Sequence, residues 1–323
     1  MNNKILVDDK KKGERLDVFI SEELNLSRSQ AQKMVKKGQV LLEGKTPKKA
    51  GQKLKYGDLV EVCQTNKRAS AGSGGPGGKS RAWFKIKVLA ETEDYLVIEK
   101  PAGLLMHQTE AKEPESLAAW ILENYPQTKD VGEYENRPGI VHRLDKEASG
   151  LVVIAKKQEM FVHLKKQFKK RQVEKEYLVL AHGRVEREHD TINFDISRSK
   201  DGRMAARPKT DRLSLRTITK IQPGKEAVTE FWVEKIFSRY TLLRVKIHTG
   251  RTHQIRVHLL AYNHPVAGDA WYANRKLNLK KDKELGRLFL HASKLCFCNL
   301  GGEKVCFEAE LAEELKRFLQ ELN

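Results

Sequence analysis

Residues 139–154 read GIVHRLDKEASGLVVI and place a cluster of polar side chains between two apolar runs. The cluster includes His142, Arg143 and Asp145, and the apolar run that follows it, residues 151–154, predicts a buried strand. Because Asp145 follows a strand-like run and a polar bend, its carboxylate can face a cleft. A carboxylate in a partly dry cleft must be paired with a cation, since burying the unpaired ion is costly. We therefore predict a paired Asp145 that can act as a nucleophile or a base.

The segment 249–258, TGRTHQIRVH, contains the cations that such a carboxylate needs. Arg251 and Arg256 are the candidate partners of Asp145, and a guanidinium held against it would keep the carboxylate ionised. An interior ion pair that only stabilises the fold is the alternative interpretation of the same residues. The residue types alone leave both interpretations open.

His248, His253 and His258 recur every five residues, which raises the question of a metal site. Beyond Gly250 the segment predicts a helix, in which a five-residue step separates side chains by roughly 140°. Neighbouring histidines would then point apart, so we expect no metal ion and histidines that pack, orient neighbours or contact phosphate. The sequence also contains no Walker loop, no G-x-G-x-x-G after a strand, no G-x-S-x-G and no H-E-x-x-H. We therefore expect no cofactor.

The composition favours a polyanionic partner. The chain has 323 residues, a formal net charge of +18 and 39% hydrophobic residues, enough for a substantial core. Such an excess of lysine and arginine points to nucleic acid in preference to an anionic membrane. No run approaches the ~18 apolar residues of a membrane span, and the N-terminal segment lacks the apolar core of a signal peptide. We expect a cytoplasmic protein.

The four cysteines contain no C-x-x-C pair. Cys296 and Cys298 alternate within LCFCNL, so they are expected to face one side of a strand as buried thiols. A C-x-C metal pair is the alternative, but it lacks a second pair nearby. The cysteines therefore predict a reducing compartment.

A Gly/Ser-rich, basic segment at 65–82, TNKRASAGSGGPGGKSRA, has the composition of a flexible linker. It divides the chain into an N-terminal tail at 1–12, a small module at 13–64 and a large domain at 83–323. The division predicts two separately folded parts.

The small module predicts two helices followed by two short strands. LDVFISEEL has an imperfect helical face, and Ser27 is an N-cap candidate for a second helix that stops at Gly38. The module resembles the S4 RNA-binding domain through residues 15–17, 26–31, 38–40, 44–45 and 57–58. This resemblance implies a unit that grips the backbone of structured RNA, although a solvated helix surface would explain the basic residues equally well. The candidate RNA contacts are Arg15, Arg28, Ser29, Lys33, Lys36 and Lys37.

The large domain predicts an α+β fold with a mixed, mostly antiparallel sheet. Five segments rich in β-branched and aromatic residues predict strands, and three longer periodic segments predict helices, without a regular βαβ rhythm. The strand segments are 95–100, 150–156, 175–183, 229–236 and 241–248, and the helical segments are 116–125, 157–171 and 252–262.

The stretch HRLDKEASGLVVIAK resembles the catalytic motif of the RluA family of pseudouridine synthases, whose usual form is HRLDxxTSG before an apolar strand. Supporting matches follow in the family's order: EKPAGL with His107, then KEY, AVT, TGRTHQIRVHL, NHPVAGDAWY and LHA. Ala148 replaces the family's usual threonine. The resemblance covers the large domain and implies the fold expected above.

The resemblance also implies a role for individual residues. Asp145 matches the essential aspartate, and Arg256 matches the basic residue paired with it. Tyr177 matches the aromatic residue that stacks on the target uracil, and Leu290 lines the base's other side. Arg143 matches the side chain that enters the RNA stack where the uridine has left. Attack at C1′, addition at C6 and removal of the 2′ proton all use an ionised Asp145 and remain open.

The function implied by the resemblance is isomerisation of uridine to pseudouridine in large-subunit (23S) ribosomal RNA, free or in a pre-ribosomal subunit. A pseudouridine synthase acting on tRNA is the first alternative, because S4 modules serve both kinds of RNA. A non-catalytic RNA-binding or ribosome-assembly factor and a glycosylase that releases free uracil are alternatives of other classes. We expect a monomer that needs no cofactor, metal or membrane.

Overall fold

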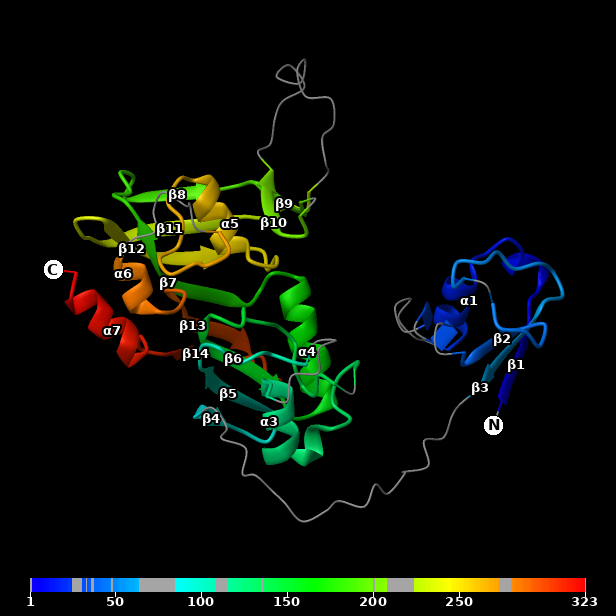
Figure 1. Ribbon diagram of the computed structural model, residues 1–323. Helices are drawn as coiled ribbons and strands as arrows, with labels where there is room; N and C mark the ends of the chain where they lie inside the picture. The colour runs from blue at the N-terminus through cyan, green and yellow to red at the C-terminus, as the bar shows by residue number, and fades with distance from the viewer. Residues whose placement is uncertain are drawn as a thin grey trace, which may run out of the picture. The chain divides into compact units, whose positions relative to one another are not determined.

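The computed structural model describes most of the chain in two compact units, Met1–Lys79 and Ser80–Asn323 (Figure 1). The division between them falls within the segment 65–82. Among the described helices, none has the length and apolar character that crossing a membrane requires. The described residues are 2–24, 31–32, 34–35, 38–47, 49–63, 85–108, 115–134, 136–199, 201–207, 224–272 and 280–322.

The N-terminal unit packs a helix against a small antiparallel sheet. The strands are β1 (Asn2–Leu6), β2 (Val40–Leu42) and β3 (Leu59–Cys63), in the order β1-β3-β2, and the helix is α1 (Leu16–Glu23), preceded by the single turn η1 (Asp9–Lys11). The predicted first helix and both predicted strands are present. Alternate residues of β3 and the apolar face of α1 form one buried cluster, as the strand and helix periodicities require.

Arg15 and Asp17 form an ion pair at the N-terminus of α1. The Arg15 guanidinium donates to both carboxylate oxygens of Asp17 at 2.9 and 3.0 Å, and the Asp17 side chain is fully buried. The other five candidate RNA contacts of this unit lie outside the described residues: Arg28, Ser29, Lys33, Lys36 and Lys37.

A nine-stranded sheet forms the centre of the C-terminal unit (Figure 1). Its order is β4-β5-β6-β13-β7-β12-β11-β8, with β14 paired to β13 beside this path, and only the β6–β13 pair is parallel. A separate hairpin joins β9 and β10. The strands are β4 (Lys87–Glu91), β5 (Tyr95–Lys100), β6 (Ser149–Ala155), β7 (Glu174–His182), β8 (His189–Ile192), β9 (Asp195–Arg198), β10 (Met204–Arg207), β11 (Thr229–Ile236), β12 (Tyr240–Ile247), β13 (Leu290–Cys298) and β14 (Lys304–Glu308).

Helices cover both faces of this sheet, which explains why β6 is buried along its whole length. On one face, Val152 and Ile154 join a core that includes α3 (Leu117–Asn124) and α5 (Gln254–Ala261). On the other face, Leu151 and Val153 pack with α4 (Gln158–Lys169). The remaining helices are η2 (Pro126–Thr128), α6 (Lys280–Leu285) and α7 (Glu313–Gln320). The predicted α+β class with a mixed, mostly antiparallel sheet is confirmed.

The expectation that Cys296 and Cys298 are both buried free thiols is wrong. Cys296 forms a disulfide with Cys306, and Cys298 is a half-buried free thiol. The turn after β13 returns the chain as β14, so that Cys296 and Cys306 lie directly opposite each other with their Cα atoms 4.1 Å apart. The C-x-C spacing considered in the sequence contains no information about this cross-strand partner.

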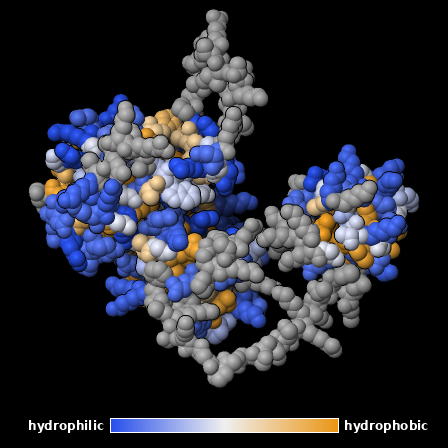
Figure 2. All heavy atoms as spheres, in the orientation of Figure 1, coloured by the Kyte–Doolittle hydropathy of each residue, from blue (hydrophilic) through white to orange (hydrophobic). Residues whose placement is uncertain are grey.

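Hydrophilic residues cover most of the visible face of each unit, and apolar residues form smaller patches there (Figure 2). This surface agrees with the net charge of +18 and with a chain that is nearly one-third charged residues. The large apolar side chains are mainly in the buried clusters on the two faces of the sheet.

Candidate active site

Asp145 lies in the loop that leads into β6, and a buried lysine at the end of β5 stabilises this loop. The Lys100 ammonium donates to the carbonyl oxygens of Pro101, Leu104 and Lys146 at 2.8, 2.9 and 3.2 Å. It therefore ties the loop after β5 to the residue that follows Asp145. Burial is the main reason that the pKa of Lys100 is lowered to about 7.

Arg256 of α5 is the cation that contacts Asp145. Its Nη1 lies 3.3 Å from Asp145 Oδ2, while its Nε and Nη2 donate to the two carboxylate oxygens of Asp269 at 2.7 and 2.8 Å. The other candidate, Arg251, instead donates from Nε to the carbonyl oxygen of Glu226 at 3.0 Å. The structure thus distinguishes two arginines that the sequence left as alternatives.

Asp269 is a site residue to which the sequence analysis assigned no role. Burial lowers the pKa of Arg256, but the hydrogen bond and charge of Asp269, followed by the charge of Asp145, raise it above its ordinary value. A guanidinium has five N–H donors, which is more than one carboxylate can accept. Because Arg256 is only 2% exposed, its remaining donors need a second acceptor within the protein. This need for a second acceptor was the signal in the sequence that could have led to Asp269.

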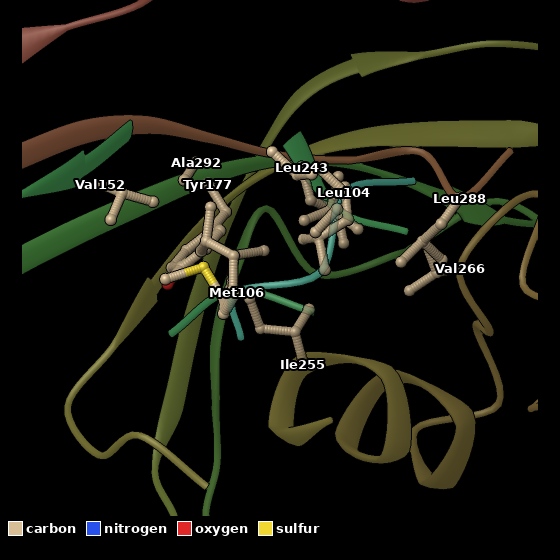
Figure 3. Close-up of a cluster of buried hydrophobic side chains, with 14 of the residues drawn as sticks. Leu104, Met106, Val152, Tyr177, Leu243, Ile255, Val266, Leu288 and Ala292 are labelled. Atoms are coloured by element: carbon tan, nitrogen blue, oxygen red, sulfur yellow. The ribbon is translucent and has the colours of Figure 1, made fainter. Parts of the chain in front are cut away.

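Tyr177 and Leu290 lie on the neighbouring strands β7 and β13 and are 6% and 4% exposed. Figure 3 shows Tyr177 beside Met106, with Ile255 extending from α5 toward the same cluster. Burial, followed by the charge of Asp145, raises the pKa of the Tyr177 phenol well above its ordinary value. The ring is therefore a neutral wall close to the carboxylate.

A cavity of about 590 Å³ opens in front of these side chains. Asp145, Arg256, Tyr177, Leu290 and Arg143 all line it. The structure therefore brings together every candidate site residue of the large domain. Arg143 and Asp145 come from one segment of the sequence, and Tyr177, Arg256 and Leu290 come from three others.

The wall of the cavity is strongly cationic. Among the described residues that line it, Asp145 is the single carboxylate, whereas seven are lysines or arginines: Arg137, Arg143, Lys169, Arg171, Lys175, Arg251 and Arg256. Burial lowers the pKa of Lys175 to about 8. A cavity with this charge suits an anionic ligand such as a nucleic-acid backbone.

His142, which had no assigned role, connects the loop to the sheet. Its ring stacks on Phe168 of α4 at a centroid distance of 4.8 Å, and its Nε2 accepts a hydrogen bond from the backbone N–H of Val153 at 3.1 Å. Burial, followed by the charge of Lys175, lowers the pKa of His142 to about 3. His142 is therefore a neutral residue that positions the loop.

The three regularly spaced histidines have separate partners. His248 lies 2.9 Å from Glu230, and His258 lies between the Thr229 hydroxyl and a backbone carbonyl. His253 contacts the Tyr272 hydroxyl at 2.7 Å. Within the described residues no group of three or more histidine, cysteine or acidic side chains could hold a metal ion.

Comparison with known proteins identifies the family. The sequence profile described as RNA pseudouridylate synthase matches residues 94–261, and the S4 domain profile matches residues 14–60. A protein of Aquifex aeolicus (strain VF5), named as an uncharacterized RNA pseudouridine synthase, is 37% identical over 312 residues, covering 94% of this chain and 92% of that protein. The ribosomal large subunit pseudouridine synthase C of Buchnera aphidicola is 31% identical over 274 residues, covering 82% of this chain and 79% of that protein.

The human protein RNA Pseudouridylate Synthase Domain Containing 1 has a similar fold, with a TM-score of 0.56 and 23% identity over 77% of this chain and 97% of its own. The 323-residue chain shown in Figure 1 belongs to the RNA pseudouridylate synthase family. It is accordingly an isomerase that acts on RNA, and it carries an S4 domain at its N-terminus.

Proposed function

We propose that this chain converts specific uridines of large-subunit (23S) ribosomal RNA to pseudouridine, with Asp145 as the catalytic carboxylate. The observation that supports this most strongly is the contact between Asp145 and Arg256 in a cationic cavity lined by Tyr177 and Leu290. A carboxylate held in this way can react with the sugar or base of a nucleotide without a cofactor.

The reaction breaks the N1–C1′ bond of uridine, turns the base, and joins C5 to C1′. A base inside folded RNA must first leave the stack, which costs a few kcal/mol. In this proposal Arg143, which is exposed at the cavity, fills the gap left in the RNA. Tyr177 then stacks on the released uracil, and Leu290 forms the opposite wall.

Ribosomal RNA is the proposed substrate because a similar protein, from Buchnera aphidicola, is named as a ribosomal large subunit pseudouridine synthase. The S4 module, proposed at 13–64, would add affinity for structured RNA through Arg15 and the other candidate contacts of the sequence analysis, and the synthase domain would span 83–323. Linking two RNA-binding parts through the segment 65–82 would raise the overall affinity by effective concentration. Transfer RNA is the alternative substrate.

The test is to express wild type, Asp145→Asn and Glu147→Gln in a host lacking related enzymes and to map pseudouridine across ribosomal and transfer RNA. Glu147 is a matched control, since its carboxylate also lies near Arg256 Nη1, at 3.5 Å, but is 40% exposed. We expect new sites in large-subunit RNA with wild type and Glu147→Gln, and none with Asp145→Asn. Identical maps for wild type and Asp145→Asn would reject the catalytic role, sites in tRNA alone would reject the substrate, and free uracil would indicate a glycosylase.

A further inference from the structure

The two oxygens of the Asp145 carboxylate face different groups. Arg256 Nη1 lies 3.3 Å from Oδ2, whereas His253 Nε2 lies 4.0 Å from Oδ1. Both the imidazole and the carboxylate are largely shielded from solvent, with side chains 18% and 13% exposed. Oδ1 therefore lies slightly beyond hydrogen-bond distance of His253 Nε2. This nitrogen can donate a hydrogen bond to Oδ1 only when it carries a proton.

A hydrogen-bond chain on the far side of the imidazole determines which nitrogen carries the proton. The backbone N–H of Met204 donates to the Tyr272 hydroxyl oxygen at 3.2 Å, and the same hydroxyl lies 2.7 Å from His253 Nδ1. A phenol has one proton to donate, and in the described structure the imidazole is its remaining partner. Tyr272 therefore donates to Nδ1, and a neutral imidazole that accepts there carries its own proton on Nε2. That nitrogen is the one that lies 4.0 Å from Asp145 Oδ1.

The backbone at this position is shaped to place the ring. His253 has φ +54° and ψ +25°, a left-handed conformation that costs a residue with a side chain about 1–2 kcal/mol. Gln254 stabilises the turn, because its Oε1 accepts from the Thr249 hydroxyl at 2.7 Å and from the Arg251 N–H at 3.0 Å. The result is that His253 and Arg256, three positions apart, approach Asp145 together.

We propose that His253 is a positioning residue for Asp145, with its Nε2–H form set by Tyr272, and that this N–H closes on Oδ1 when RNA is bound. The inference rests on the proposed catalytic role of Asp145. The closure requires a movement of about 1 Å, from 4.0 Å to an ordinary N–H···O length. Catalytic hydrogen bonds are often long in the free enzyme and shorten in the substrate complex. With both donors in place, the carboxylate is held in one rotamer, with each oxygen in a defined direction.

Three variants separate the effect of the His253 N–H donor from the effect of the left-handed backbone at this position. His253→Asn tolerates the left-handed backbone, but its amide is too short to reach Asp145. His253→Gln places an amide N–H near the position of Nε2. Tyr272→Phe leaves the imidazole intact and removes the hydroxyl that sets its proton.

We expect His253→Asn to lower kcat about 10- to 100-fold, the value of a hydrogen bond to a charged group, with little change in KM for RNA. His253→Gln should recover most of this loss. Tyr272→Phe should lower kcat in the wild-type background and have no further effect in the His253→Asn background, because the two residues act in one chain. Nitrogen-15 chemical shifts of labelled histidine should show the Nε2–H form of His253 in wild type and a mixture in Tyr272→Phe.

Equal loss of kcat in His253→Gln and His253→Asn would overturn the proposal, as would additive effects of the two substitutions or an unchanged imidazole tautomer in Tyr272→Phe. Asp145→Asn, measured in parallel, distinguishes this failure from that of the proposed function. If Asp145→Asn is inactive while both His253 variants match wild type, the positioning role alone is rejected. If Asp145→Asn is fully active, the proposed function itself fails.

Discussion

Asp269→Asn is expected to destabilise the C-terminal unit much more than Asp145→Asn, although both carboxylates contact the same guanidinium. Arg256 is 2% exposed, and its two short hydrogen bonds go to Asp269, which is fully buried. Its bond to Asp145 is longer, at 3.3 Å, and Asp145 is partly exposed. Loss of Asp145 therefore leaves both short hydrogen bonds of the buried cation in place. Loss of the Asp269 charge leaves it with only the longer contacts to Asp145 and Glu147, both of which are more exposed than Asp269.

The expected magnitudes follow from this geometry. Removing one partner of a buried ion pair costs about 3–5 kcal/mol. Asparagine keeps a carbonyl oxygen for the backbone N–H groups of Trp271 and Tyr272, which places the loss near the lower end, about 3 kcal/mol. For a unit of this size that corresponds to a melting temperature lower by about 6–12 °C. Asp145→Asn should cost about 1 kcal/mol or less.

Differential scanning calorimetry of the full chain measures both effects, with activity assayed on the same samples. Asp201→Asn is the control, since its ion pair with Arg203 is exposed and is expected to contribute almost nothing. Asp145→Asn should be inactive and stable, while Asp269→Asn should be destabilised and partly active. Equal melting temperatures for Asp145→Asn and Asp269→Asn would refute the assignment of Asp269 as the principal partner of Arg256.

Three further predictions concern the cavity and the buried histidines. Burial lowers the pKa of Lys175 to about 8, so RNA affinity should weaken as the pH rises through about 8; fluorescence titration should show this step in wild type and not in Lys175→Gln. Arg143→Ala should lower single-turnover activity at an unchanged melting temperature, because the side chain is exposed; a matching fall in melting temperature would contradict a role in RNA. Burial lowers the pKa values of three histidines, His142, His258 and His291, to about 3, 4 and 4. Below pH 6.5 these histidines take up protons in the unfolded chain but not in the folded one, so the melting temperature should fall from pH 6.5 toward pH 4. A melting temperature that does not change over this range would count against buried neutral rings.

Local periodicity explains why the helices and strands could be predicted from the sequence. Apolar residues repeat within each segment, so the segments 150–156 and 157–171 contain the signals of β6 and α4 by themselves. The boundary of α5 is the informative difference. The helical pattern starts at 252, but the helix begins at Gln254 because His253 adopts a left-handed conformation. Helical periodicity cannot detect such a turn when the residue before the helix is not glycine.

Contacts between distant segments explain what the sequence could not show. The partner of Cys296 lies across a hairpin, and Asp269 lies 13 positions after Arg256 beyond a helix and a turn. The contact between Tyr272 and His253 likewise needs the folded loop after α5. No local pattern favours these partners over other residues of the same type.

The polar residues between the two apolar runs of residues 139–154 have different surroundings and therefore different roles. Arg143 is exposed, Leu144 is buried, and Asp145 faces the cavity. His142 points to the sheet, where its neutral ring accepts the Val153 N–H and brings no charge into the core. Burying a charge there would be costly. The loop can therefore be anchored to β6 by an uncharged polar group and still present the Asp145 carboxylate to the cavity, where a guanidinium balances it.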